Sequence, residues 1–214
     1  MKILISAGPT IEKIDPARYI SNFSSGKMGY ALAKSAKSLR HDVVLVSGPV
    51  SIKEIHGVKT IHVESTADMA CEIRRESRNA DLVIMAAAVA DYRPAKFAEQ
   101  KIKKSNDKMI LELEKTEDIL AWLGRNRRKS QTIVGFSAET ENLIENAVKK
   151  LKAKKIDWIV ANEIGKNDRG FSSDTNAVTL ISKKGDTTEI PLMKKEKVAQ
   201  RILGIIGIKE AGRV

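Results

Sequence analysis

The sequence of 214 residues predicts an α/β fold built on a doubly wound, mostly parallel sheet. Strand-like and helix-like segments alternate along the chain, which is typical of a parallel sheet with helices on both faces. The uninterrupted apolar run Leu82–Ala86 suits a central strand that is buried on both faces. Because no repeat, low-complexity tract or long linker interrupts the pattern, we expect one Rossmann-like domain over residues 1–214.

The elements follow one another from the amino terminus. A strand is expected at Lys2–Ala7 and a helix at Gly26–Leu39, where apolar residues recur at intervals of four, four and three residues. Ser24 or Ser25 is expected to cap the first turn of that helix. The pattern continues with strands at Asp42–Val46, Thr60–Val63, Leu82–Ala86, Thr132–Phe136 and Trp158–Ala161, and with helices at Ala67–Ser77, Asn142–Lys154 and Lys194–Gly207.

Two stretches depart from this alternation. Lys101–Leu113 has the features of a hairpin or flap, with a turn at Ser105–Asp107. Ala177–Pro191 contains two alternating runs around Lys183–Asp186, which indicate a β-hairpin. We therefore expect a flap near residues 101–113 and a hairpin near residues 177–191, both appended to the main sheet.

Composition limits the class of protein. The formal net charge of +11 favours polyanionic partners such as nucleotides or phosphorylated metabolites. Aromatic residues make up only 4% of the chain, which argues against nucleic-acid binding by base stacking. No run of about 18 apolar residues occurs, so no membrane association is expected. Cys71, the only cysteine, is expected to be a small packing residue within a helix, and its isolation fits a reducing cytoplasm.

Several common nucleotide and metal sites are excluded by their motifs. The dinucleotide fingerprint G-x-G-x-x-G is absent, and the strand ending at Val46 has no acidic residue to bind a ribose. A P-loop is excluded because Met28 follows Gly26-Lys27 and Ser21 stands where the motif needs glycine. The three histidines lie at no zinc-ligand spacing, so a zinc site is not expected.

The segment before the first helix has the features of a phosphate-binding site. Glycines within Ser24–Gly29 allow a ligand to approach the backbone closely, and the free N–H groups of a first helical turn bind anions. Lys27 adds a positive charge, while Arg18 and Asn22 supply donors in the loop that leads to the turn. An ordinary capped helix after a loop explains Ser24–Gly29 equally well, but it accounts less readily for Arg18 and Asn22.

Three further pieces could contribute to a ligand site. The small residues of Ala86–Pro94 would let a base or sugar lie on the backbone, with Asp91 as an acceptor or merely a solvated side chain. Lys101 and Lys103 share one face of an extended segment and could neutralise a triphosphate or protect a strand edge. Lys150 and Lys154 lie four residues apart, which is also usual for a solvated helix edge.

Five motifs in one order relate these pieces to a known family. They are Pro-x-Arg-Tyr-Ile-Ser-Asn-x-Ser-Ser-Gly-Lys-Met-Gly (Pro16–Gly29), Ala-Ala-Ala-Val-Ala-Asp-Tyr-Arg-Pro (Ala86–Pro94), Lys-Ile-Lys-Lys (Lys101–Lys104), Val-Gly-Phe-x-Ala-Glu-Thr (Val134–Thr140) and Gly-Phe-x-Ser-Asp-x-Asn (Gly170–Asn176). Together they resemble phosphopantothenate–cysteine ligase of coenzyme A biosynthesis, in its bacterial CTP-using form. In many bacteria this domain is the C-terminal half of a bifunctional protein that also carries a decarboxylase. Phe23 and Ser137 depart from the usual pattern, and neither replaces a residue assigned below.

The resemblance implies a reaction in two steps. The carboxylate of 4′-phosphopantothenate attacks the α-phosphate of CTP, with Mg²⁺, to give an acyl-cytidylate and pyrophosphate. The amine of L-cysteine then displaces CMP and forms the amide. The resemblance assigns Asn22 to stabilisation and conversion of the acyl-cytidylate by donation to an oxyanion, Lys101 to the phosphates, and Arg18 to the substrate carboxylate or phosphate. It gives no metal ligands.

The resemblance also implies which residues bind the nucleotide. They are Gly8, Ser25, Gly26, Lys27, Met28, Gly29, Ala87, Asp91, Glu117, Asp118, Ile119, Leu120, Phe136, Lys150 and Lys154. A homodimer built partly from the flap and hairpin is implied as well, and a separate phosphopantothenoylcysteine decarboxylase is a further partner to consider. The alternatives are the same ligation with ATP, a non-catalytic Rossmann-like nucleotide sensor, and a basic nucleic-acid-binding module.

Overall fold

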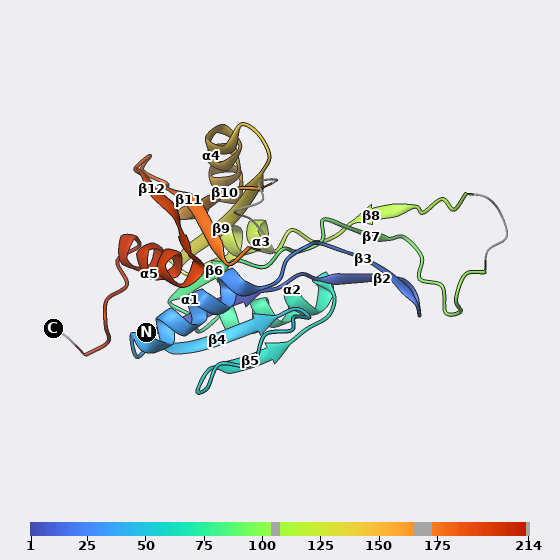
Figure 1. Cartoon of the computed structure of the whole chain (residues 1–214), viewed down its shortest axis with the longest axis horizontal. Helices are drawn as coiled ribbons and strands as arrows, with labels where there is room; N and C mark the ends of the chain where they lie inside the picture. The colour runs from blue at the N-terminus through green and yellow to red at the C-terminus, as the bar shows by residue number, and fades with distance from the viewer. Residues whose placement is uncertain (104–107, 165–172, 213–214) are drawn as a thin grey trace.

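The structure is a computed structural model that describes residues 1–103, 108–164 and 173–212 (Figure 1). Its centre is an eight-stranded sheet with the strand order β12-β11-β10-β9-β6-β1-β4-β5. The sheet strands are β1 (Lys2–Ala7), β4 (Asp42–Ser47), β5 (Lys59–His62), β6 (Leu82–Met85), β9 (Thr132–Glu139), β10 (Trp158–Glu163), β11 (Thr175–Ser182) and β12 (Thr187–Lys194). The helices are α1 (Lys27–Ser38), α2 (Thr66–Ser77), α3 (Ile119–Asn126), α4 (Leu143–Lys154) and α5 (Lys195–Ile205).

The pairing of the strands confirms the doubly wound α/β prediction. β5, β4, β1, β6, β9 and β10 are all parallel to their neighbours. The chain passes from β1 outward to β4 and β5, then returns to β6 and continues outward in the opposite direction to β9 and β10. The strand order therefore reverses between β1 and β6, and the crevice beyond the carboxyl ends of such strands is where ligands bind in this class of sheet.

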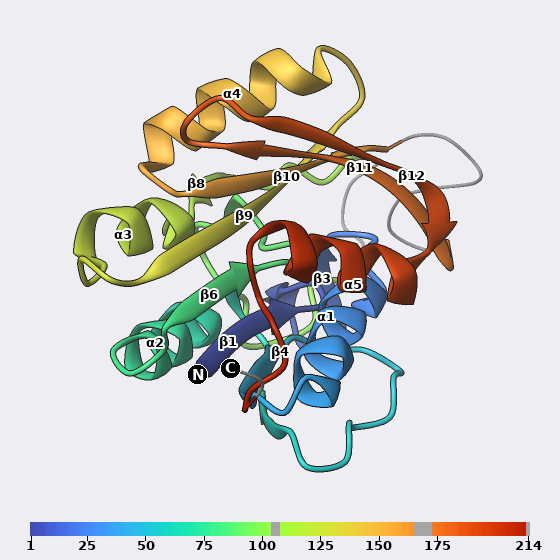
Figure 2. The same ribbon diagram turned by 90° about the vertical axis from the view of Figure 1, so that its left-hand side faces the viewer.

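Helices cover both faces of the sheet (Figure 2). On one face, side chains of α1 and α5 such as Leu32 and Ile202 pack against Ile3 and Ile5 of β1. On the other face α2, α3 and α4 pack against a second cluster, which includes Leu4 from the same strand. Successive side chains of a strand point to opposite faces, so the continuous apolar run of β1 serves both cores.

The predicted hairpin at residues 177–191 exists, but it is not appended outside the sheet. β11 pairs antiparallel with β10, for example Val160 opposite Leu180, so the hairpin extends the main sheet by two strands. The sheet is consequently mixed at this edge. Buried and partly exposed residues alternate only at the start of β11, because from Val178 onward the strand is buried between β10 and β12 and beneath the helices.

A long arm projects from this body (Figure 1). It contains the antiparallel pair β2 (Ile11–Asp15) and β3 (Arg18–Ser21), and a second antiparallel pair, β7 (Tyr92–Pro94) and β8 (Leu113–Lys115). The second pair corresponds to the base of the predicted flap, whose predicted turn at Ser105–Asp107 lies outside the described residues. The β2–β3 hairpin and the helix α3 were not among the predicted elements.

The helix caps correct two expectations. Neither Ser24 nor Ser25 caps α1; its N-cap is Gly26, with a φ of 78° and no side-chain cap. Ser65 does cap α2, in a reciprocal capping box with Asp68. Cys71 is exposed on α2 and therefore is not the packing residue that the sequence suggested, because it lies on the outer face of that helix.

Candidate functional site

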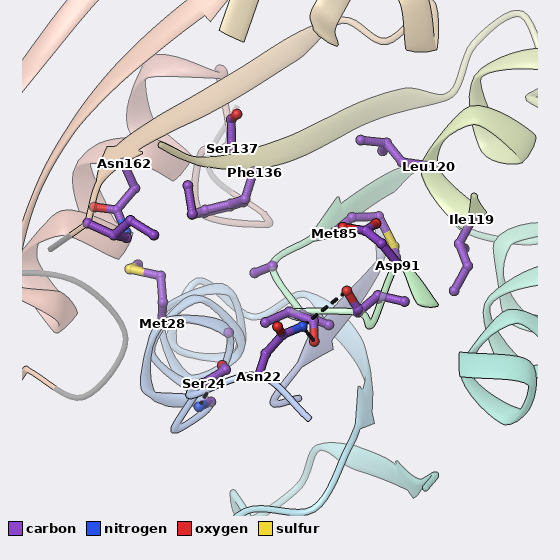
Figure 3. Close-up of a pocket in the computed structure, with 18 of the residues that line it drawn as sticks. Asn22, Ser24, Met28, Met85, Asp91, Ile119, Leu120, Phe136, Ser137 and Asn162 are labelled. Carbon is purple, nitrogen blue, oxygen red and sulfur yellow. Dashed lines mark hydrogen bonds between the residues drawn. The ribbon is translucent and has the colours of Figure 1, made fainter. Parts of the chain in front are cut away.

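A pocket of about 420 Å³ lies beyond the carboxyl ends of the central strands (Figure 3). Segments that are far apart in the sequence contribute to it, including the amino-terminal ends of α1, α3 and α5. The pocket brings together most of the predicted nucleotide residues: Gly26, Lys27, Met28, Gly29, Ala87, Asp91, Glu117, Asp118, Ile119, Leu120, Phe136, Lys150 and Lys154, together with Asn22. Gly8 and Ser25 do not line it, although a Cβ atom at Gly26 would lie 3.4 Å from the Cα of Gly8, so Gly8 lies close to the turn.

The first turn of α1 forms one wall of the pocket. A Cβ atom at Gly29 would lie 2.5 Å from the Cβ of Ala7, so only glycine lets α1 pack this closely on β1. Gly26 has a positive φ and starts the helix without a capping side chain, and the residues of this first turn line the pocket. Such a turn is suited to bind an anion.

The loop after β6 forms the floor and is held by buried hydrogen bonds. Ala88 N–H donates to the Gly8 carbonyl at 2.9 Å, and Ala87 N–H donates to Ser6 Oγ at 3.1 Å. Ala90 N–H donates to the hydroxyl of Thr10 at 2.9 Å. These bonds fix the backbone of the loop, which can then present its remaining polar groups to a ligand in a constant geometry.

Asn22 reaches this loop from the end of β3 (Figure 3). Its amide Nδ2 donates to the carbonyl of Ala88 at 3.0 Å and to the carbonyl of Val89 at 3.2 Å. Because carbonyl oxygens only accept hydrogen bonds, the end of the amide that faces them must be the NH₂ group. Oδ1 is therefore the group that Asn22 offers to a ligand, whereas the sequence reasoning expected the NH₂ to serve as the donor.

The α3 end of the pocket combines acidic and basic side chains. Asp118 caps α3 by accepting from Ala121 N–H at 2.8 Å, and it forms an ion pair with Lys154 of α4. Burial acts to raise the pKa of Asp118, but Lys154 and the Ala121 N–H together hold the pKa below its ordinary value. Burial lowers the pKa of Lys150, against the opposing effect of Glu139 and Asp91. This end therefore offers both hydrogen-bond acceptors and ammonium groups.

The opposite end of the pocket lies between α1 and α5. Lys27 pairs with Asp174 at 2.6 Å. Lys195, the first residue of α5, is only 6% exposed and lines the pocket; burial and the neighbouring Lys27 lower its pKa to about 8. Sequence reasoning missed Lys195 and Asn176 as pocket residues, and it placed Asn162 only by its position at the end of the expected strand Trp158–Ala161, where ligands of such sheets bind. Lys195 has no distinguishing signal among the lysines of the chain.

Two of the three predicted catalytic residues lie outside the pocket. Arg18, on the arm, binds Asp15 and donates to the Ile102 carbonyl at 3.0 Å, and the pKa of Asp15 is held well below its ordinary value mainly by Arg18. Lys101 is exposed beside this cluster. Neither side chain lines the pocket. The residue predicted to bind the substrate and the lysine predicted to act on the phosphates therefore lie together on the arm.

Two features are absent from the part of the chain that the structure describes. No three His, Cys, Asp or Glu side chains there come together in a way that could hold a metal ion. None of the helices in the same ranges is both long enough and apolar enough to cross a membrane.

Comparison with known proteins agrees with this architecture. The family model described as "DNA/pantothenate metabolism flavoprotein C-terminal domain" matches residues 1–208. The coenzyme A biosynthesis bifunctional protein CoaBC of Bacillus subtilis is 46% identical over 202 residues, which cover 94% of this chain and 50% of that protein. The chain thus spans about half the length of this curated relative.

Solved structures give the same result. The crystal structure of the C-terminal domain of CoaBC superposes with a TM-score of 0.81 at 45% identity, over 96% of this chain and 93% of that one. A DNA/pantothenate metabolism flavoprotein from Streptococcus pneumoniae shares the fold, with a TM-score of 0.80 at 24% identity over 96% of this chain and 98% of that one. On the sequence match over residues 1–208 and on this shared architecture, the chain belongs to the family of the DNA/pantothenate metabolism flavoprotein C-terminal domain.

Proposed function

We propose that this chain is a phosphopantothenate–cysteine ligase that uses CTP and forms an acyl-cytidylate. The observation that carries the proposal is the convergence, in one pocket, of the α1 anion-binding turn, the fixed loop after β6 and the side chain of Asn22. Membership of a family whose relatives include a coenzyme A biosynthesis protein supports the substrate class.

In the first step the chain binds and orients two anionic substrates. The first turn of α1 and Lys27 bind phosphate oxygens, while the loop after β6, Asp91 and Phe136 surround the base and sugar. The carboxylate of phosphopantothenate then attacks the α-phosphorus, and positioning supplies much of the rate. Mg²⁺ would neutralise charge on the triphosphate. Because the described residues offer no cluster of carboxylates, the ion would be held by the phosphate oxygens and by water, with Asn162 Oδ1 as an acceptor for that water.

In the second step Asn22 acts on the attacking amine of cysteine. The amine forms a bond to the acyl carbon, the bond to the CMP oxygen breaks, and the surplus proton passes to water. Oδ1 of Asn22 accepts a hydrogen bond from the amine as positive charge develops on nitrogen. A neutral amide can do this without capturing the acyl group itself.

We also propose that the working unit is a homodimer in the cytoplasm. Seven of the ten exposed large hydrophobic side chains in the described residues belong to the arm or its root: Tyr19, Phe23, Tyr92, Phe97, Met109, Ile110 and Leu113. Phe23 is 89% exposed and Ile110 is 93% exposed, which a second copy of the chain would relieve. The arm would then bring Arg18 and Lys101 of one chain to the pocket of the other. A separate phosphopantothenoylcysteine decarboxylase would consume the product.

The test is pyrophosphate release from CTP and phosphopantothenate, measured with and without cysteine. We expect a single turnover without cysteine and continued turnover with it, with the amide product identified by mass spectrometry. ATP should support the reaction far less well, because backbone groups of a fixed loop reject a base whose donors and acceptors they leave unpaired. Absence of CTP-dependent pyrophosphate release would refute the ligase, and equal rates with ATP would refute the choice of nucleotide.

A further inference from the structure

Lys195 lies in an unusual position for a lysine. It is the first residue of α5, its side chain is 6% exposed, and it lines the pocket together with Lys27, the first residue of α1. The amino-terminal ends of two long helices therefore meet at one end of the pocket, each with a lysine in its first position. The helix dipoles at these two ends favour a bound anion.

The charges around Lys195 are close together. Lys27 disfavours the charged form of Lys195, and the carboxylate of Asp174 acts in the opposite direction while it pairs with Lys27 at 2.6 Å. The backbone N–H of Lys195 also donates to the Asp174 carbonyl at 2.9 Å, which fixes the start of α5 beside this pair. Two ammonium groups held this near each other in a partly buried place are stabilised when a multiply charged anion binds between them.

A second observation at the same end concerns Asn162. It is 9% exposed, it lines the pocket, and its buried Oδ1 has no hydrogen-bond partner among the described residues. Asn162 lies opposite Val178 of the neighbouring strand β11. Asn176, two residues before Val178, differs from Asn162 because its Oδ1 accepts a hydrogen bond from Ala177 N–H at 3.1 Å. A buried acceptor without a partner is costly, so Asn162 Oδ1 is expected to meet a donor on a ligand.

We propose that Lys195 binds the two outer phosphates of a nucleoside triphosphate, and that Asn162 Oδ1 accepts a hydrogen bond from water on the accompanying Mg²⁺. The identity of the nucleotide rests on the proposed function. Asp91 and Leu120 lie at the α3 end of the pocket, while Met28 and Asn162 lie at the other (Figure 3), so a nucleotide whose base occupies the α3 end extends its phosphates toward Lys195.

This placement gives Lys195 a role in the first step. When the substrate carboxylate bonds to the α-phosphorus, the bond from that phosphorus to the bridging oxygen breaks. The electron pair stays on the leaving pyrophosphate, and no proton is transferred. Lys195 then faces the negative charge that develops on this leaving group, which an ammonium in a partly dehydrated site stabilises more strongly than one in water.

The test compares triphosphate with monophosphate binding by calorimetry, in the presence of Mg²⁺. Lys195→Gln should weaken CTP binding by about tenfold or more and leave CMP binding within about twofold, because only the triphosphate reaches this end. The matched control is Lys197→Gln, which removes an exposed lysine from the same first turn of α5 and should change neither affinity. Asn162→Ala should weaken CTP binding with Mg²⁺ but not in its absence.

The outcomes separate the inference from the proposed function. Equal weakening of CTP and CMP by Lys195→Gln would show that Lys195 only shapes the pocket, and an unchanged CTP affinity would remove it from the site. If wild-type chain binds CTP but makes no amide product, the phosphate site stands and the ligase fails. If no nucleotide binds, the binding of inorganic pyrophosphate is measured instead. Loss of that binding in Lys195→Gln supports the phosphate site, and unchanged binding refutes it. If Lys195→Gln does not fold, Lys195→Arg should restore folding and pyrophosphate binding together.

Discussion

The body and the arm of this molecule use apolar side chains in opposite ways. In the body, both faces of the sheet are covered, and side chains such as Leu123 and Ile84 are fully buried. On the arm, Ile110 and Phe97 are exposed although they are as apolar as the core residues. The core of the body is therefore buried within one chain, whereas the described part of the arm exposes an apolar surface of the kind that marks an interaction site.

The same contrast divides the candidate site. Asn22 and the first turn of α1 belong to the pocket of the body, while Arg18 and Lys101 belong to the arm. If the two halves of the site come from two chains, substitutions on the arm should damage catalysis without damaging the fold. The division predicts different outcomes for substitutions on the arm, in the pocket and in the core of the body.

The largest effect is expected on the arm, at Lys101. Lys101→Gln keeps the length of the side chain but removes the charge that would act on the phosphates during acyl-cytidylate formation. Removal of one such contact slows a reaction about 10²–10³-fold. Single-turnover pyrophosphate release without cysteine isolates this step, with Lys96→Gln as the control because it removes an exposed lysine of the same arm that has no assigned role. A normal rate would make Lys101 an ordinary surface charge.

The second prediction joins body and arm. Asn22→Asp should spare pyrophosphate release but block amide formation, because a carboxylate cannot donate to the Ala88 and Val89 carbonyls and is repelled by them. The acyl-cytidylate should then accumulate and be visible by mass spectrometry. Product formation at the wild-type rate would remove Asn22 from this role.

A mixture of Asn22→Asp and Lys101→Gln chains extends this test. If each site combines the pocket of one chain with the arm of the other, a mixed dimer has one intact site and one doubly damaged site. Random mixing makes half of the dimers mixed, so roughly a quarter of the wild-type activity should return. If both residues act within one chain, each mixed dimer has two damaged sites and no activity returns.

The difference between body and arm also explains how far the sequence could predict the structure. The body was predicted well because its buried runs, such as Leu82–Ala86, are continuous and its helices have regular apolar spacing. The β2–β3 hairpin was missed because β2 does not alternate: Ile11 and Ile14 are separated by Glu12, whose buried carboxylate accepts from Thr66 N–H at 2.8 Å. Tertiary contacts of this kind leave no local pattern.

The pocket shows the same limit. Its α1 wall and the loop after β6 could be predicted from glycines and small residues at strand ends. The short helix α3 could not, because Gly124 weakens its helical signal, and glycine is required there since a Cβ would lie 1.8 Å from the Lys154 carbonyl. Lys195 became a pocket residue only through the pairing of β11 and β12 that positions α5.

The third prediction compares stability in the two regions. Leu123→Ala in the body creates a cavity between α3 and the sheet and should cost about 2–5 kcal/mol of unfolding free energy. Ile110→Ala on the arm should cost less than about 0.5 kcal/mol at concentrations where the chain is monomeric, because in a single chain its side chain is already in water. Urea unfolding measures both, and light scattering should show that Ile110→Asp, not Leu123→Ala, shifts the dimer toward monomer. A monomeric wild type at all concentrations would contradict the proposed assembly.

The smallest effect is expected where two helices of the body meet the pocket. Asp118→Asn keeps the cap of α3 but removes the charge that pairs with Lys154, and because both partners are partly exposed it should cost less than about 1 kcal/mol. Burial works against the charged form, yet Lys154 still lowers the pKa of Asp118 from 3.8. A carboxylate with a lowered folded pKa stabilises the protein above its unfolded pKa, and this contribution is lost as the pH falls through the folded value. The difference in the free energy of unfolding between wild type and Asp118→Asn, measured in urea, should therefore be present at neutral pH and vanish in strong acid.

The ion pair is isolated by a double variant. Lys154→Gln should give a similar loss of unfolding free energy, and the double variant should lose little more than either single variant. Additive losses would show that the two side chains stabilise α3 and α4 independently.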